Sequence, residues 1–211
     1  MKRARVTGKS IASDNCAGRS ASAARGVGLL EFLIALCVFT ASMSGVMSVQ
    51  LAAKRASFEA HQYSIANALA VDILTRIAAN PGQVDLYTAA VAGDAAEPQP
   101  SPGTNCNTSA CTPEQLAVFD LWRWEAALLG ANETSAGQSA GGLSAPRACF
   151  RRSGSLVTLG LSWRGATPSD EASGLRCGAL VPGLYDVADA EPGNNRLRRH
   201  LELSTIVVGV P

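Results

Sequence analysis

The sequence predicts an α+β fold, in which one long N-terminal helix packs against a C-terminal antiparallel sheet. Three patterns support it: an uncharged apolar run from Phe32 to Ala53, a helical spacing of apolar residues that continues to Ile77, and alternating apolar residues near the C-terminus. A helix with one apolar stripe and a sheet with one apolar face bury these surfaces against each other. We therefore expect a two-layer domain after the apolar run.

The long helix is expected to run from Val27 to about Ala79. Its first part, residues 27–53, has the length and composition of a membrane span, for which about 20 apolar residues suffice. After Lys54 and Arg55, apolar residues recur three or four positions apart, as on a helix with one buried face. These are Ala66, Leu69, Ala70, Ile73, Leu74 and Ile77. Asn80-Pro81-Gly82 ends the helix near residue 80.

A second, shorter helix is predicted between two loops. Residues 81–112 are rich in Ala, Gly, Pro, Ser and Asn and are typical of an irregular loop. Thr112-Pro113-Glu114-Gln115 has the pattern of a capped helix start with a capping box. The helix would extend to about Leu129, with apolar contacts from Leu116, Phe119, Leu121, Trp122 and Trp124. The Gly- and Ser-rich residues 130–146 form the next predicted loop.

Strands are predicted in residues 147–211. Leu156 to Trp163 alternates apolar and small or polar residues, which is typical of a strand with one buried face. Residues 148–152 would pair with it in a hairpin that turns at Ser153-Gly154, and residues 200–208 would form the last strand. Two basic clusters, Arg151-Arg152 and residues 196–200, are expected to be solvated.

Four cysteines follow the apolar run. An even number of cysteines in an exported domain indicates two disulfides, for which three connectivities exist. Proximity in the sequence favours Cys106 with Cys111, which leaves Cys149 with Cys177. Zinc is the less favoured alternative, because no C-x-x-C pair occurs and the histidines are distant. Two further cysteines, Cys16 and Cys37, lie before and within the apolar run.

One carboxylate, Glu31, lies at the start of the apolar run. An acidic side chain at the centre of a bilayer costs on the order of 2.5–3.5 kcal/mol, so Glu31 needs a partner charge. A free α-amino group, created by cleavage after Gly26, would be such a partner, and Glu31 would then be the fifth residue of the mature chain.

The segment resembles the signal of type IV prepilins in Arg25, Gly26, Val27, Glu31 and the apolar run that follows. It departs from the commonest pattern at Val27, usually phenylalanine or methionine, and at Gly28, usually threonine. The resemblance implies that prepilin peptidase cleaves between Gly26 and Val27 and N-methylates Val27, and that Glu31 positions the subunit during assembly. The alternatives are a secretory signal, whose apolar core is shorter and precedes its cleavage site, and a plain membrane anchor.

The charge distribution predicts the topology. Residues 1–26 contain six basic residues and one acidic residue, a net charge of +5, whereas the whole chain is +1, so the remainder is −4. The positive-inside rule then places the leader in the cytoplasm and residues 54–211 outside the inner membrane, in the periplasm of a bacterium. A mature chain of negative net charge also argues against nucleic-acid binding.

Later segments resemble the PilV family of type IV pilus modification proteins. The similar blocks are residues 72–82 (DILTRIAANPG), 111–117 (CTPEQLA), 120–124 (DLWRW), 162–165 (SWRG) and 198–205 (RRHLELST). The resemblance implies a pilin fold and a minor pilin that takes part in initiating assembly near the pilus tip. The implied partners are other minor pilins, the major pilin, prepilin peptidase and the assembly platform of the inner membrane. It implies no catalytic residue, metal or cofactor.

Two alternatives remain open. A minor pseudopilin of a type II secretion system shares the signal and the glutamate. In a different class, an anchored periplasmic serine hydrolase would use Ser139, because residues 137–141 fit G-x-S-x-G and Asp186, Asp189 and His200 follow in the required order. The context disfavours the hydrolase, since no apolar strand leads into this Gly- and Ser-rich tract. Of the two histidines, His61 lies on the long helix near Glu59 and is expected to face solvent, and His200 lies beside Arg198 and Arg199, which disfavours a metal site.

Overall fold

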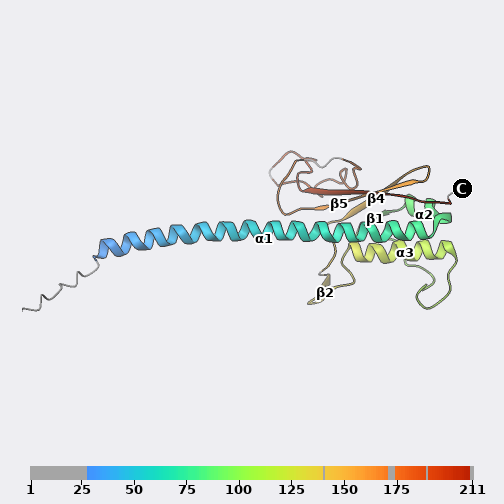
Figure 1. Ribbon diagram of the computed structural model, residues 1–211, viewed down its shortest axis with the longest axis horizontal. Coiled ribbons are helices and arrows are strands. Elements are labelled where there is room, and N and C mark those ends of the chain that lie inside the picture. Colours follow the sequence, from blue (N-terminus) through green and yellow to red (C-terminus); the bar gives the residue numbers. More distant parts are fainter. Residues whose placement is uncertain (1–27, 140, 171–173, 189, 210–211) are drawn as a thin grey trace, which may run out of the picture. The chain divides into compact units, whose positions relative to one another are not determined.

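The computed structural model describes residues 28–139, 141–170, 174–188 and 190–209. The chain divides into two compact units, residues 1–47 and 48–211. Helix α1, Leu29–Ala79, is a single helix of 51 residues and supplies the N-terminal part of the second unit (Figure 1). The predicted end of this helix at Ala79 is confirmed, whereas its predicted start at Val27 lies outside the described residues.

The second unit contains a four-stranded antiparallel sheet in the order β1-β4-β5-β6. The strands are β1 (Val91–Ala92), β4 (Arg147–Ser153), β5 (Leu156–Arg164) and β6 (Arg198–Ile206). In the register of the sheet, Leu159 of β5 lies opposite Phe150 of β4 and Leu203 of β6. The long helix followed by an antiparallel sheet confirms the predicted α+β fold.

The core lies between the sheet and the C-terminal half of α1. The predicted stripe of α1 is buried at Ala66, Ala70, Ile73, Leu74 and Ile77, and Leu69 is half-buried. The facing side chains of β5 are Val157, Leu159, Leu161 and Trp163, all with 0% exposure. At ~25 cal/mol per Å² of apolar surface, this burial is the main stabilising contribution to the unit.

Helix α3, Pro113–Leu128, packs against α1 through Trp124, whose indole N–H donates to the Leu69 carbonyl at 2.8 Å. The capping box is confirmed: Thr112 accepts from the Gln115 amide, and the Gln115 side chain accepts from the Thr112 amide. Phe119, Leu121 and Trp124 are buried as expected. Leu116 and Trp122 are 39% and 37% exposed, so the prediction that they make core contacts is wrong in part.

The two predicted loops contain more structure than expected. In residues 81–112 the chain forms a short 3₁₀ helix (Pro81–Gln83), α2 (Val84–Ala89) and β1. Val84 and Tyr87 anchor α2 in the core, and the prediction of an irregular loop for residues 81–112 is wrong for this segment. Residues 130–146 include the short hairpin β2 (Thr134–Ser135) and β3 (Gln138–Ser139).

The second basic cluster, residues 196–200, is partly buried, and the prediction that it is solvated is wrong. Arg198 and Arg199 are 1% and 9% exposed rather than solvated, and β6 begins at Arg198, two residues before the predicted start. Both faces of β5 are covered, because residues 174–178 cross its outer face. A Cβ at Gly160 would lie 2.7 Å from the Leu175 Cβ and 2.8 Å from the Cys177 Sγ, so the close crossing requires glycine there.

Candidate assembly site

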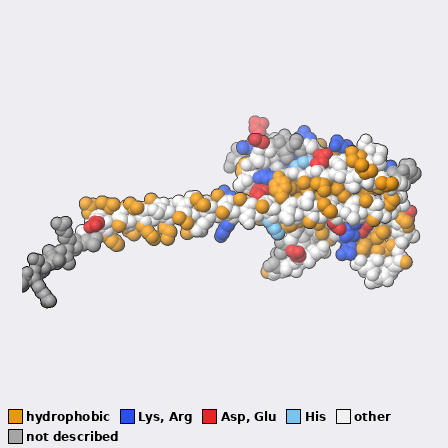
Figure 2. All heavy atoms as spheres, viewed as in Figure 1, with side chains coloured by type: hydrophobic (Ala, Val, Ile, Leu, Met, Phe, Trp, Pro, Cys, Tyr) orange, Lys and Arg blue, Asp and Glu red, His pale blue; other side chains and the backbone are white. Residues whose placement is uncertain are grey.

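Residues 29–53 of α1 form an apolar helical surface in the described chain. Large side chains are exposed along it, from Leu29 at 84% to Leu51 at 50%, and the space-filling view shows orange side chains on this segment (Figure 2). The helix is long and apolar enough to cross a membrane by length and composition. An exposed apolar surface of this length is stable in contact with lipid or with other apolar helices.

Three hydroxyl groups of this segment are satisfied within the helix. The Thr40 hydroxyl donates to the Cys37 carbonyl at 2.9 Å, Ser42 donates to Val38 at 2.8 Å, and Ser44 donates to Thr40 at 2.9 Å. A helix in lipid has to satisfy its polar groups internally in this way. Cys37 is a free, exposed cysteine in the same segment.

Glu31 lies in the first turn of α1. A carboxylate at a helix N-terminus is favoured by the helix dipole, by about 0.3–1 kcal/mol. Among the described residues, no hydrogen bond or ion pair reaches its carboxylate, and the helix carries no other charge before Lys54. Gly26 and Val27, the predicted cleavage and methylation residues, lie outside the described residues. An exposed carboxylate in these surroundings can bind a positively charged group.

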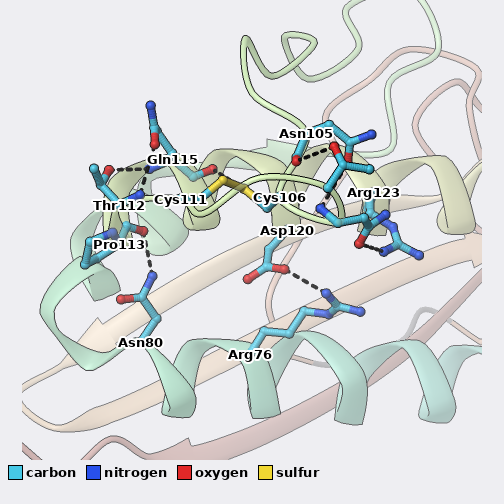
Figure 3. The surroundings of a disulfide bond; sticks show 12 residues. Arg76, Asn80, Asn105, Cys106, Cys111, Thr112, Pro113, Gln115, Asp120 and Arg123 are labelled. Atoms are coloured by element: carbon cyan, nitrogen blue, oxygen red, sulfur yellow. Dashed lines mark hydrogen bonds and ion pairs between the residues drawn. A yellow bond between two sulfur atoms is a disulfide. The ribbon is translucent and has the colours of Figure 1, made fainter.

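The C-terminal half of α1 carries a different charged site (Figure 3). Arg76 pairs with Asp72 one turn earlier, at 3.0 Å, and with Asp120 of α3, at 2.7 Å. The other Asp120 oxygen accepts from the Tyr87 hydroxyl of α2 at 2.8 Å. Burial raises the pKa of the Tyr87 phenol, which keeps it a hydrogen-bond donor. Asp120 therefore joins α1, α2 and α3.

Four more contacts hold the segments around this network. The Asn80 side-chain amide at the end of α1 donates to the Pro113 carbonyl at 2.8 Å, at the start of α3 (Figure 3). Glu125, 2% exposed, accepts from the Gly93 amide at 2.7 Å and from the Gln99 amide. Arg147 pairs with Asp94 at 3.0 Å. The segment after β1 is thus attached to both α3 and the sheet.

Glu59 of α1 and Arg199 of β6 form a bidentate pair that sequence reasoning missed. The two hydrogen bonds are 3.1 and 3.0 Å, and the side chains are 16% and 10% exposed. Glu59 also accepts from the Ala166 amide at 2.7 Å, and Arg199 donates to the Thr167 carbonyl at 2.7 Å. The pair connects the helix, the last strand and the loop after β5. Because the residues are 140 positions apart, no local pattern could have predicted it.

Two disulfides hold loops on the second unit. Cys106 is bonded to Cys111, beside the start of α3 (Figure 3), and Cys149 of β4 is bonded to Cys177. This is the connectivity that sequence proximity favoured over the two others. The second bond holds residues 174–178 against the outer face of the sheet.

The geometry around Ser139 does not match a nucleophile elbow. Ser139 ends the two-residue strand β3, which pairs with β2 in a hairpin, and β4 rather than a helix follows. Asp189 lies outside the described residues. Asp186 accepts from the Gly193 and Asn195 amides at 2.8 and 3.0 Å. These hydrogen bonds lower the pKa of the Asp186 carboxyl and explain the residue as part of a turn.

His200 has structural partners as well. Its Nδ1 lies 3.2 Å from the Ser162 hydroxyl and its Nε2 lies 3.5 Å from Glu202. Ser162 is fully buried and also accepts from Arg198 at 3.2 Å, so a substrate has no access to its hydroxyl. Burial lowers the pKa of the imidazole, a trend that Glu202 opposes. His61 is exposed on α1, and no cluster of three possible metal ligands occurs among the described residues.

Part of the chain is similar to a known protein family. Residues 48–122 match the family model described as "Tt1218-like: Type IV pilin Tt1218". No curated protein and no solved structure matches the chain. The matched range runs from the middle of α1 to Trp122 of α3 and so includes Arg76, Tyr87 and Asp120. It supports a type IV pilin, a structural and non-enzymatic protein, and agrees with the expectation that the chain is not an enzyme.

Proposed function

We propose that the chain is a minor pilin that takes part in initiating the assembly of a type IV pilus. The observation that carries this proposal is Glu31: a carboxylate at the head of an apolar helical segment, without a partner among the described residues. The match to a type IV pilin over residues 48–122 supports the same class. The similarity of several later segments to the PilV family favours a minor pilin over the major subunit.

The proposed maturation begins in the inner membrane. Residues 1–26 are a cytoplasmic leader, residues 27–53 span the membrane, and residues 54–211 form the periplasmic head. Prepilin peptidase cleaves between Gly26 and Val27 and methylates the new amine. The mature subunit then enters a complex with other minor pilins and the major pilin at the assembly platform, near the tip of the growing filament.

The carboxylate of Glu31 explains why cleavage would precede assembly. Cleavage creates an amine about one helical turn before Glu31, which the carboxylate of a neighbouring subunit can pair with, and an ion pair is much stronger in a medium of low dielectric constant than in water. Hydrogen bonds to charged groups contribute about 1.5–3 kcal/mol. Glu31 therefore favours the assembled state over the isolated helix.

Deletion of the chain in its own strain tests the role. We expect loss of surface pili and of twitching, and recovery of the protein in sheared filaments when it is restored. Normal piliation together with lost secretion of exported enzymes would identify a minor pseudopilin instead. A Ser139→Ala variant that restores pili as well as the unchanged chain excludes a hydrolase that depends on this serine.

A further inference from the structure

The last strand, β6, forms one edge of the sheet and pairs only with β5 in the described part of the chain. Its backbone polarity follows from one contact: the Val207 amide donates to the Ser155 carbonyl at 2.8 Å, in register with the pairing of Ile206 to Leu156. In an antiparallel pair, residues alternate between those that bond the neighbour and those that face away. The amides and carbonyls of Glu202, Ser204 and Ile206 therefore face the open edge.

The C-terminal end of this edge lacks most of the features that protect edge strands. Charges, prolines, bulges and short length usually prevent such a strand from pairing with another chain. β6 has nine residues, and residues 203–208 contain neither a charge nor a proline. Exposed apolar side chains gather at the same end: Ile206 at 66%, Val208 at 82%, and Leu156 of β5 at 42%.

The opposite edge of the sheet, formed by β1, is less available for pairing with another strand. Strand β1 has two residues, and its Val91 carbonyl accepts from the Gln99 side chain at 2.8 Å. It cannot supply a strand that matches the length of β6. A second copy of this chain therefore has no complementary edge to offer in a side-by-side arrangement.

Pairing of β6 with β6 of a second copy is also unsuitable. Antiparallel pairing of two identical edges requires a two-fold axis normal to the sheet. Because α1 runs along the sheet (Figure 1), this axis reverses residues 48–79 of α1 in the second copy. The two chains would then have to enter one membrane from opposite directions.

We infer that the outer edge at the C-terminal end of β6, from Ser204 to Ile206, together with Val208 just beyond it, binds an extended strand of a different pilin-like subunit anchored in the same membrane. β1 is antiparallel to β4, β4 to β5, and β5 to β6, so the two edges of this sheet run in opposite directions. A neighbour of the same topology, placed with its helix parallel to α1, presents its first edge strand antiparallel to β6. Main-chain bonds then supply affinity, and apolar side chains facing Leu156, Ile206 and Val208 supply specificity.

This inference rests on the proposed function, since it requires a neighbour with a parallel helix. Its test uses the full-length chain in detergent, co-expressed with each of the other pilin-like subunits of its strain in turn. Hydrogen exchange resolved to single residues is measured with and without the subunit. We expect one of these subunits to slow exchange of the Ser204 and Ile206 amides at least about tenfold, while the Leu203 and Thr205 amides, already bonded to β5, change less.

Two variants and a control complete the test. Ser204→Pro removes an outward amide, and Ile206→Lys places a charge on the apolar end without changing the backbone. Both are expected to abolish the protection and the complex. Leu180→Lys, at a residue that is 83% exposed elsewhere on the surface, is expected to leave both unchanged.

Several results would overturn the inference. A complex that forms without protection of the Ser204 and Ile206 amides, or that survives Ile206→Lys, refutes it but leaves the proposed function standing. Self-association of the chain through β6 identifies a second copy as the occupant and also refutes it. If no pilin-like subunit binds and the chain is absent from sheared filaments, both the inference and the proposed function fail.

Discussion

The charged side chains in the two halves of α1, residues 29–53 and 54–79, differ in whether they have partners within the chain. In residues 54–79, Glu59 and Arg76 each contact partners on other elements, at 2.7 to 3.1 Å. In residues 29–53 the one charge, Glu31, has no partner among the described residues, and the large apolar side chains are exposed. Glu59 and Arg76 are thus satisfied within the chain, whereas Glu31 and the exposed apolar side chains of the N-terminal half are available to a membrane and to other subunits.

Removing one carboxylate from each half tests this difference and should produce the largest effect. We expect Glu31→Ala to leave folding of the head unchanged but to lower recovery in sheared filaments by about ten- to a hundredfold, since charged hydrogen bonds contribute about 1.5–3 kcal/mol. Glu59→Ala should instead lower the thermal stability of the head, because Arg199 then keeps a buried charge without its carboxylate. Normal recovery of Glu31→Ala in filaments would refute the pairing of Glu31.

Within the head, the two carboxylates that pair with Arg76, Asp120 and Asp72, are expected to differ in their contribution to stability. Asp120→Ala removes the acceptor of the Tyr87 hydroxyl and one of the two carboxylates that pair with Arg76, whose side chain is 32% exposed. The expected loss of unfolding free energy lies between that of an exposed pair, about 0.2–1 kcal/mol, and that of breaking a fully buried one, about 3–5 kcal/mol. Asp72→Ala is the matched control, because Asp72 contacts the same arginine from a side chain that is 43% exposed; an exposed pair contributes about 0.2–1 kcal/mol. Denaturant unfolding followed by tryptophan fluorescence measures both, and equal losses would contradict the assigned role of Asp120.

The two disulfides should differ in the same measurement. Loss of Cys149–Cys177, which spans 28 residues, removes about 3.5 kcal/mol by loop-closure entropy, and loss of Cys106–Cys111, which spans 5 residues, removes about 2 kcal/mol. Paired Cys→Ala substitutions test this order. A larger loss from the shorter loop would show that the 106–111 loop contributes more than its closure entropy.

The smallest expected effect concerns pH. The folded-state pKa of His200 is lowered because burial disfavours the imidazolium, so the unfolded chain binds the proton more tightly. This contribution to stability is fully present above the ordinary pKa of about 6.5 and is lost as pH falls through the lower folded-state pKa. The melting temperature should fall over this range, and less so in His200→Gln. An identical slope in that variant would contradict the assignment.

Local patterns were sufficient to predict the elements whose signals lie close together in the sequence. The end of α1 at Asn80-Pro81, the capping box at Thr112 and the alternation of β5 each depend on a few neighbouring residues, and each was confirmed. The buried face of α1 was predicted for the same reason, since a period of 3.6 residues is visible in the sequence.

Features that depend on distant residues were not predictable in this way. Arg199 lies in a basic run that is typical of a solvated surface, and its burial depends on distant partners: Glu59, 140 positions away, and Thr167. Tyr87 and Val84 gave no signal because the core contacts that stabilise α2 come from other elements. The site at Glu31 is the reverse case: its signal is local and was visible in the sequence, while its proposed partner belongs to another molecule.

The N-terminus of the protein extracted from membranes of its own strain tests the central claim most directly. Mass spectrometry is expected to find a chain that begins with N-methylated Val27, which would place a free amine four residues before Glu31. An intact leader, or cleavage after the apolar run, would contradict the account, since no amine would then be available to pair with Glu31 of a neighbouring subunit.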